Sequence, residues 1–393
     1  MIRTRFVLVA IAAALLVAGC KSKSAPARDE TLSVNPCRDR GACRSECDKG
    51  VESGCTRLGE MLQTGHGGEV DPEQARGLFD RACNAGHKLG CVDLGLLYQD
   101  GLGVEQSWSR AADLYTKACD AHLGVACMNL AGMVEAGAGV KRDAARADEL
   151  FKKAAVEYER GCQAGETEWC VNLGILCTED RGVPKNLARA ASLYDDACKK
   201  GNLNGCNNYA DALLNGEGVA ADVPRAIELL TSTCKAGIGL SCAELAVAHA
   251  SGKAGPSEPA KALELFNRAC ELGTPRACST AAGYHEAGKA GPADLPKAIS
   301  LHERACRAGE ASSCSRLAKI YLSGQGVATA PAKAADFDRR ACNMGDPSAC
   351  MDLSVLHAMG NGIPRNDEQA LFYLDRACLF GHPGACDLMQ QRH

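Results

Sequence analysis

The sequence is poor in aromatic residues. Phe, Trp and Tyr make up 4% of its 393 residues, and only two of them are tryptophan. Aromatic side chains usually supply much of the buried area of a core, so this chain must pack through small residues over thin interfaces. A strong surplus of one charge is also lacking, because 44 basic and 48 acidic residues are interspersed and leave a formal net charge of −4. That balance speaks against a nucleic-acid partner.

Common catalytic motifs are absent as well. Neither G-x-S-x-G nor H-E-x-x-H occurs, and no cysteines stand at the C-x2-C spacing that metal sites favour. One S-x-x-K tetrad, Ser232 to Lys235, fits part of the serine β-lactamase pattern, but no S-D-N or K-T-G element accompanies it. We therefore predict no catalytic residue and no cofactor.

Long apolar runs are missing except at the start, where residues 6–18 are apolar and follow two arginines. This order is typical of an export signal, and the run is too short for a comfortable membrane span. The run ends in "LVAGC", which resembles a bacterial lipobox and implies cleavage before Cys20 and a lipid on that residue. We expect residues 1–19 to be a lipoprotein signal peptide and residues 20–36 to be a lipidated tether. An ordinary secretory signal with an incidental Cys20 is the alternative.

Cysteine, in contrast, is abundant, with 24 residues. Twenty of them form ten C-x7-C pairs, and successive pairs begin 36 residues apart except for one interval of 43. The pairs are Cys47 and Cys55, Cys83 and Cys91, Cys119 and Cys127, Cys162 and Cys170, Cys198 and Cys206, Cys234 and Cys242, Cys270 and Cys278, Cys306 and Cys314, Cys342 and Cys350, and Cys378 and Cys386. So many cysteines in an exported chain indicate a disulfide framework.

Each repeated unit has the pattern of two helices. Apolar residues recur at helical spacing from the second cysteine of a pair onward, and we call this predicted helix A. A glycine-rich turn follows, then an N-capping residue and a second apolar stripe, helix B. The first cysteine of the next pair is expected to close helix B, and the second cysteine to open the next helix A. A disulfide within each pair would therefore staple helix B of one unit to helix A of the next.

The one long interval supports this interpretation. Cys162 arrives seven residues after the position where the period places it, which Ala155 occupies. Seven residues at about 100° each fall about 20° short of two full turns, so Cys162 returns to the same face of helix B. An insertion that preserves the helical phase is what a bridge between helices requires.

Three further cysteines lie outside the pairs and Cys20. We expect Cys37 and Cys43 to form a local bridge that caps the first unit, because the end of a repeat array needs a special closure. Cys177 then remains as the free thiol. It lies in the apolar stripe of a helix A, which favours a buried and inert thiol over a reactive one.

The units, with the pattern "GCxxLGxLYxxGxGVxxDxxxAxxLYxxAC", resemble Sel1-like repeats, which are relatives of tetratricopeptide repeats. The cysteine pair makes them similar to the Helicobacter cysteine-rich protein family in particular. The resemblance implies an all-α protein, an α/α solenoid that forms a right-handed superhelix stapled by disulfides. It divides the chain into a capping stub (37–54), nine repeats (55–386) and a truncated C-terminal helix (387–393).

Histidines recur in helix A, seven residues after the second cysteine, at His249, His285 and His357. Helices of neighbouring repeats pack about 8 to 10 Å apart, so His249 and His285 are weak candidates for a metal site. No third ligand is evident. The alternative is that these rings replace the tyrosine that packs at this position in other repeats, and we favour it because the position belongs to the apolar stripe.

Proteins similar to this one are scaffolds that bind other proteins, and some cysteine-rich members are described as weak penicillin binders or β-lactamases. We expect a noncatalytic, exported, lipid-anchored scaffold of the bacterial envelope. A protein or peptide partner would bind one face of the solenoid. The chain would face the periplasm, with the outer membrane favoured because Lys21 follows Cys20, or the cell surface. A weak β-lactamase or penicillin-binding protein is the alternative function.

Overall fold

The computed structural model describes residues 37–390, and within that range it contains helices and no strand. The helices are α2 (Arg40–Asp48), α3 (Glu52–Thr64), α4 (Pro72–Asn84), α5 (Lys88–Asp100), α6 (Trp108–Asp120), α7 (Gly124–Ala136), α8 (Ala144–Gln163), α9 (Thr167–Glu179), α10 (Leu187–Lys199), α11 (Leu203–Asn215), α12 (Val223–Lys235), α13 (Gly239–Ser251), α14 (Pro259–Glu271), α15 (Pro275–Ala287), α16 (Leu295–Arg307), α17 (Ala311–Ser323), α18 (Pro331–Asn343), α19 (Pro347–Met359), α20 (Asp367–Leu379) and α21 (Pro383–Gln390).

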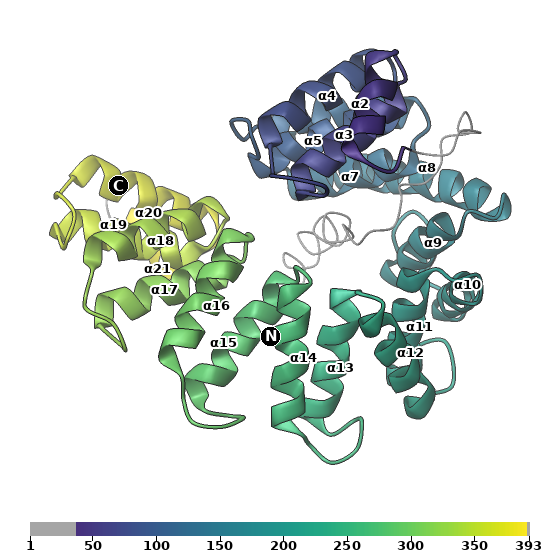
Figure 1. The fold of residues 1–393 in the computed structure, drawn as a ribbon. Coiled ribbons are helices and arrows are strands. Elements are labelled where there is room, and N and C mark those ends of the chain that lie inside the picture. Colours follow the sequence, from purple (N-terminus) through teal and green to yellow (C-terminus); the bar gives the residue numbers. More distant parts are fainter. Residues whose placement is uncertain (1–36, 391–393) are drawn as a thin grey trace. The chain divides into compact units, whose positions relative to one another are not determined.

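The helices form two compact units, which divide between Ala221 and Asp222. Unit 1 contains α2 to α11 and unit 2 contains α12 to α21. Within each unit, successive helices lie side by side as hairpins (Figure 1). Helices α3 and α5, and likewise α9 and α11, are also in contact, so the A helices of these neighbouring repeats share one layer. The expected all-α solenoid is confirmed.

Disulfides join all ten predicted pairs, and a further bridge joins Cys37 to Cys43. The Cα atoms of the ten pairs lie 4.4 to 4.8 Å apart. Nine bridges connect helix B of one repeat with helix A of the next, and the first connects the stub α2 with α3. The ten bridges join Cys47 to Cys55, Cys83 to Cys91, Cys119 to Cys127, Cys162 to Cys170, Cys198 to Cys206, Cys234 to Cys242, Cys270 to Cys278, Cys306 to Cys314, Cys342 to Cys350 and Cys378 to Cys386.

The second cysteine of each pair does not open helix A, and this corrects the expectation from the sequence. Helix α5 starts at Lys88, three residues before its cysteine, and every A helix starts at the same point relative to its own. The cysteines that lie one turn inside a helix are Cys55, Cys91, Cys127, Cys170, Cys206, Cys242, Cys278, Cys314, Cys350 and Cys386. The reason is the short hinge, because a single glycine ends helix B and the next helix starts two residues later.

Two of the expected domain boundaries fall within helices. The expected end of the stub at residue 54 falls inside α3, and the expected start of the last helix at 387 falls inside α21. Each staple therefore joins the last turn of one helix to the end of the first turn of the next.

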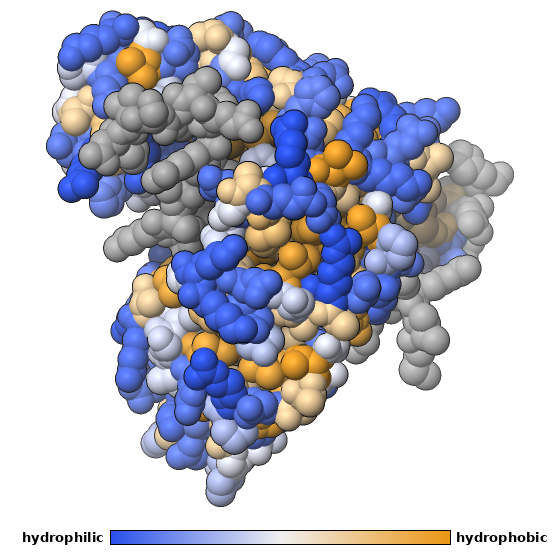
Figure 2. Space-filling view, turned by 90° about the vertical axis from the view of Figure 1, so that its right-hand side faces the viewer, coloured by the Kyte–Doolittle hydropathy of each residue, from blue (hydrophilic) through white to orange (hydrophobic). Residues whose placement is uncertain are grey.

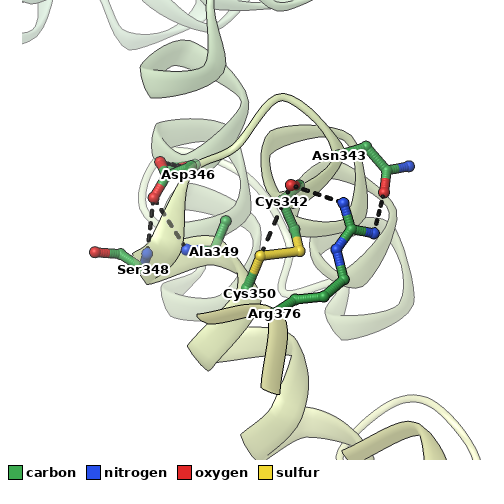
Figure 3. Close-up of a disulfide and its surroundings, with 8 residues drawn as sticks. Cys342, Asn343, Asp346, Ser348, Ala349, Cys350 and Arg376 are labelled. Atoms are coloured by element: carbon green, nitrogen blue, oxygen red, sulfur yellow. Dashed lines mark hydrogen bonds between the residues drawn. A yellow bond between two sulfur atoms is a disulfide. The ribbon is translucent and has the colours of Figure 1, made fainter. Parts of the chain in front are cut away.

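The hinge is closed by hydrogen bonds as well as by a disulfide, as the pair Cys342 and Cys350 illustrates (Figure 3). Gly345, at a φ of 88°, donates its N–H to the carbonyl of Cys342. Asp346 then caps the next helix, because its side chain accepts from the N–H groups of Ser348 and Ala349. The positive φ explains why a glycine stands at this point.

A basic residue two positions before the first cysteine ties neighbouring repeats together. The Arg81 guanidinium donates to the carbonyl of Cys47 over 2.7 Å, and Lys117 donates to the carbonyl of Cys83 over 2.9 Å. Arg376 reaches the carbonyl of Cys342 in the same way (Figure 3). These carbonyls lie at the end of the preceding helix B, where a cation is well placed.

The core of each repeat is built around the residue four positions before the first cysteine. It is buried in all nine repeats, and in order these residues are Phe79, Tyr115, Tyr158, Tyr194, Leu230, Phe266, His302, Asp338 and Leu374. In several repeats the ring lies directly against a glycine of helix A. A Cβ at Gly95 would stand 2.5 Å from the ring of Tyr115, and one at Gly174 would stand 2.4 Å from that of Tyr194. Glycine is therefore required there by close approach of the two helices.

We predict that Gly95→Ala lowers the free energy of unfolding by on the order of 1–3 kcal/mol, because the added methyl group must displace the buried Tyr115 ring. Gly283→Ala is the matched control, since it lies in a helix A where a Cβ would meet nothing within 4 Å. That control should raise stability slightly through helix propensity. Urea denaturation with intact disulfides measures both changes. Equal effects of the two substitutions would contradict this account of the core.

Candidate functional site

One polar row runs along the A helices of unit 1. Asn129 of α7, Asn172 of α9 and Asn208 of α11 each stand two residues after the second cysteine, so they occupy equivalent places in three consecutive repeats. Because α9 and α11 pack against each other, Asn172 and Asn208 lie on neighbouring helices of one layer. The side chains of these two residues are half-buried and therefore border the solvent.

The carboxamides of this row have hydrogen-bonding capacity to spare. In residues 37–390, no hydrogen bond joins the side chain of Asn172 or Asn208 to another residue. Asn129 is only 8% exposed, and its buried amide nitrogen has no partner in that part of the chain. A buried amide without a partner costs free energy, and a bound polar group would relieve that cost.

A glycine next to the row leaves room for such a group. Gly132 stands one turn after Asn129 in the middle of α7, where glycine weakens a helix. Nothing lies within 4 Å of the place where its Cβ would be, so packing within the chain does not explain it. The glycine leaves the helix surface open beside the buried amide of Asn129.

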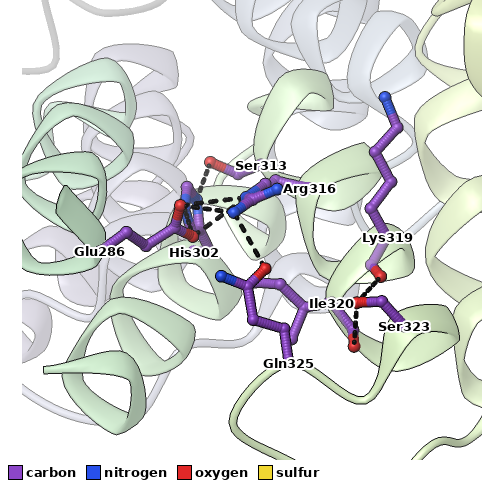
Figure 4. Close-up of polar contacts among 8 residues, drawn as sticks. All are labelled: Glu286, His302, Ser313, Arg316, Lys319, Ile320, Ser323 and Gln325. Atoms are coloured by element: carbon purple, nitrogen blue, oxygen red, sulfur yellow. Dashed lines mark hydrogen bonds and ion pairs between the residues drawn. The ribbon is translucent and has the colours of Figure 1, made fainter. Parts of the chain in front are cut away.

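A second polar group lies in the core of unit 2. His302 of α16 takes the position that a ring occupies in other repeats, and it contacts α15 and α17 (Figure 4). Its Nδ1 lies 3.1 Å from the hydroxyl of Ser313, and its Nε2 lies 3.2 Å from Oε1 of Glu286. The guanidinium of Arg316 donates hydrogen bonds to both oxygens of the Glu286 carboxylate, and the shortest of these measures 2.8 Å. Burial lowers the pKa of His302, and the Glu286 carboxylate opposes part of that effect.

The three side chains have the order of a serine, histidine and carboxylate triad. The serine, however, is not accessible to a substrate. Ser313 is fully buried and His302 is nearly so, so no substrate reaches the hydroxyl in this conformation. The backbone N–H of Ser313 is also engaged by the carbonyl of Glu310. The network satisfies a buried imidazole, and we assign it a structural role.

The residues singled out in the sequence do not form a site in the described chain. Ser232 and Lys235 are both exposed near the end of α12. His249 of α13 is buried, and its Nδ1 lies 2.9 Å from Glu258. The ring of His357 stacks on Tyr373, with centroids 5.6 Å apart, so it packs as the alternative interpretation expects. In residues 37–390, no three metal-ligating side chains come together, with or without His285.

Cys177 is the free thiol of the described chain, and it is fully buried in α9. Burial raises the pKa of this thiol above its ordinary value, which disfavours the reactive thiolate. Cys20 lies outside the described residues, as do the expected signal peptide and tether. No helix in residues 37–390 has the length and apolar character needed to cross a bilayer.

Sequence reasoning missed both the asparagine row and the polar core residues. The signal for the row is an asparagine that recurs two positions after the second cysteine in three repeats, five positions before the place where the histidines recur in others. His302 and Asp338 were visible as polar residues four positions before a first cysteine. Only the structure shows that the side chain at this position is buried in every repeat.

Comparison with known families gives the chain its identity. The family model of the Sel1 repeat matches nine segments, which are residues 53–87, 89–123, 124–155, 170–202, 203–238, 239–274, 277–310, 311–346 and 347–382. The chain belongs to the Sel1 repeat family. The unmatched residues 156–169 include the C-terminal part of α8, the helix B that carries the seven-residue insertion.

Solved structures similar to this Sel1 repeat chain include three bacterial proteins. A protective antigen of uropathogenic Escherichia coli is 25% identical, with a TM-score of 0.47 over 88% of this chain and 79% of that one. A Sel1 repeat protein from Oxalobacter formigenes is 22% identical, with a TM-score of 0.44 over 58% and 90%. Helicobacter pylori cysteine rich protein B is 26% identical, with a TM-score of 0.28 over 33% and 92%. No curated protein gave a significant match.

The eighth of the nine Sel1 repeats buries a carboxyl group. Asp338 of α18 is fully buried at the ring position, and neither of its oxygens has a hydrogen-bond partner in residues 37–390. Burial, followed by the charges of Asp352 and Asp346, raises the pKa of Asp338 from 3.8 to about 8, while Lys319 acts in the opposite direction. The folded repeat therefore holds a neutral Asp338 at pH 7.

This raised pKa predicts a definite pH dependence. The unfolded chain releases the Asp338 proton near pH 4 and the folded chain near pH 8, so stability falls as the pH rises between these values. Asp338→Asn cannot ionise and should remove this fall, which raises the free energy of unfolding at pH 8 by on the order of 3 kcal/mol. Denaturation curves of both proteins between pH 5 and pH 9 test it. The control is pH 5, where the two should differ much less. A constant difference across the range would show that Asp338 does not titrate as described.

Proposed function

We propose that this protein is an exported, lipid-anchored scaffold that binds an extended segment of another protein along the A helices of unit 1. Sel1 repeat proteins generally mediate protein–protein interactions. The observation that supports a site in this chain is the row Asn129, Asn172 and Asn208, in which the amide nitrogen of Asn129, beside Gly132, has no partner in the described chain.

The chemistry of the row suits a peptide backbone. A carboxamide both donates and accepts, so one asparagine can pair with the C=O and N–H of a peptide. Neighbouring helices lie about 8 to 10 Å apart, and an extended chain advances about 3.3 Å per residue. A segment that crosses α9 and α11 would thus present one peptide group to Asn172 and another, about three residues later, to Asn208. Such contacts select an extended conformation and leave the side chains of the partner free to vary.

On the face shown in Figure 2, hydrophilic side chains predominate and apolar ones appear in smaller areas between them. A scaffold of this kind would bind through polar backbone contacts supplemented by local apolar ones, such as the half-buried Ile175 one turn after Asn172.

We predict that replacing Asn172 and Asn208 by alanine weakens peptide binding by about tenfold to a hundredfold, because two paired carboxamide contacts are lost. The probe is a peptide selected from a random library on the wild-type chain, and fluorescence anisotropy measures its affinity. Asn84→Ala is the control, since Asn84 is an exposed asparagine at the end of a helix B. Unchanged affinity of the double variant would remove the row from the proposed site.

Membrane attachment has its own test. We propose that Cys20 carries the lipid and places the protein in the cell envelope, on the periplasmic side of the outer membrane. Cys20→Ser should move the protein from the detergent phase to the aqueous phase on phase separation, because the acyl chains supply the membrane affinity. The free-thiol variant Cys177→Ser controls for the loss of a cysteine as such. Equal partitioning of wild type and Cys20→Ser would contradict the anchor.

A further inference from the structure

Helix α20 differs from every other helix B on its outer face. Phe372 is 50% exposed and Leu379 is 76% exposed. The residues equivalent to Leu379 are polar in the eight earlier repeats, namely Asn84, Asp120, Gln163, Lys199, Lys235, Glu271, Arg307 and Asn343. Those equivalent to Phe372 are Gly77, Asp113, Val156, Ser192, Glu228, Glu264, Ser300 and Asp336. The repeats thus provide an internal control, and it shows that two large exposed apolar residues occur together at these positions in α20 alone.

The two residues form one stripe, because positions seven apart lie within about 20° of each other around a helix. Arg376 borders the stripe, and its guanidinium lies over the rings of Phe372 and Phe380 at 5.7 and 5.4 Å from their centroids. It also donates to Asn343 and to the carbonyl of Cys342. The surface is therefore held in place by neighbouring contacts, and it combines aromatic residues with an arginine, as interface hot spots commonly do.

Charges flank the stripe with opposite signs on its two sides. At about 100° per residue, Glu368 and Asp375 lie on one side of Phe372 and Leu379, and Arg376 lies on the other. Both acidic side chains are exposed. The guanidinium of Arg376 has five N–H groups, of which two donate within the chain, so the others can donate to a further carboxylate.

We propose that this surface binds a second copy of the chain, with the two α20 helices side by side and parallel about a twofold axis. In that arrangement Phe372 and Leu379 meet their own copies at the centre. The twofold axis also brings the basic side of one helix to the acidic side of the other, so each Arg376 faces the partner's Asp375. The surface is self-complementary in both apolar character and charge, which is the requirement for an interface that uses the same patch twice.

The first experiment measures mass by analytical ultracentrifugation of the full chain in mild detergent, from about 1 to about 100 µM, where modest interfaces associate. The wild type should form a dimer in this range. Phe372→Asp should weaken dimerisation at least a hundredfold, because it buries a charge at the centre of the interface. Val247→Asp is the matched control, since Val247 is a 55% exposed valine of α13, and it should dimerise like the wild type.

The second experiment separates complementarity from simple loss of apolar surface. Asp375→Arg places two cations opposite each other and should weaken dimerisation about tenfold, as should Arg376→Glu. The double variant Asp375→Arg/Arg376→Glu restores opposite charges across the axis and should return within about threefold of the wild type. Circular dichroism melts confirm that each variant is folded.

Three outcomes would overturn the proposal. The wild type could remain monomeric over the whole range, in which case the stripe serves another protein or a membrane. The dimer could persist in Phe372→Asp, which would place its interface elsewhere. The double charge reversal could fail to restore a dimer that both single reversals weaken, which would exclude the parallel arrangement.

Discussion

The structure depends on the packing of one side chain per repeat against a residue of helix A that is small enough to admit it. This contact lets two helices approach closely where a Tyr115 or Phe79 ring fills the space above a glycine. It allows a chain with few aromatic residues to form a continuous core, because one buried side chain per repeat, aromatic in five of the nine, fills the space between two closely packed helices. The disulfide at each hinge shortens the connection between repeats and limits the conformations of the unfolded chain.

Unit 2 departs from this arrangement in two neighbouring repeats, and the two departures have opposite chemistry. The imidazole of His302 is satisfied by Ser313 and Glu286, and burial favours its neutral form, which predominates at higher pH. The carboxyl group of Asp338 has no such partner in the described chain and favours its neutral form at lower pH. Polar groups at two of these buried positions make the stability of this unit depend on pH in both directions, whereas unit 1 fills the same positions with Phe and Tyr.

The two proposed binding surfaces lie in different units of the solenoid. The A helices of unit 1 carry asparagines at a constant register, of which Asn172 and Asn208 are half-buried and suit an extended backbone. The apolar stripe of α20 lies in unit 2, on a helix B, and suits a partner with a rigid, matching surface. A protein that combined the two would present more than one peptide-binding row in each assembly, and such a multivalent arrangement increases apparent affinity without any new contact.

Most of the architecture could be predicted from local pattern. The period of 36 residues, the C-x7-C pairs and the capping residues Asp71 and Ser107 are features of short segments, so helix pairs and their bridges followed from the sequence. Even the inserted turns of α8 could be placed, because a helix has a fixed angle per residue. The first residue of each helix A was harder to predict, since the hinge is too short to give a clear sequence signal between the two helices.

The candidate sites required the tertiary structure, because each depends on what surrounds a residue and not on its own type. Asn129 is unusual only because its amide is buried without a partner in the described chain. Asp338 is unusual only because packing buries its carboxyl group without such a partner. Ser313, His302 and Glu286 come from three helices, and only packing brings them together and hides them from solvent. The sequence by itself determined the repeat, its helices and its bridges through local periodicity. Burial depends on all the neighbours of a residue at once, and it decided which polar residues lack a hydrogen-bond partner or have a shifted pKa.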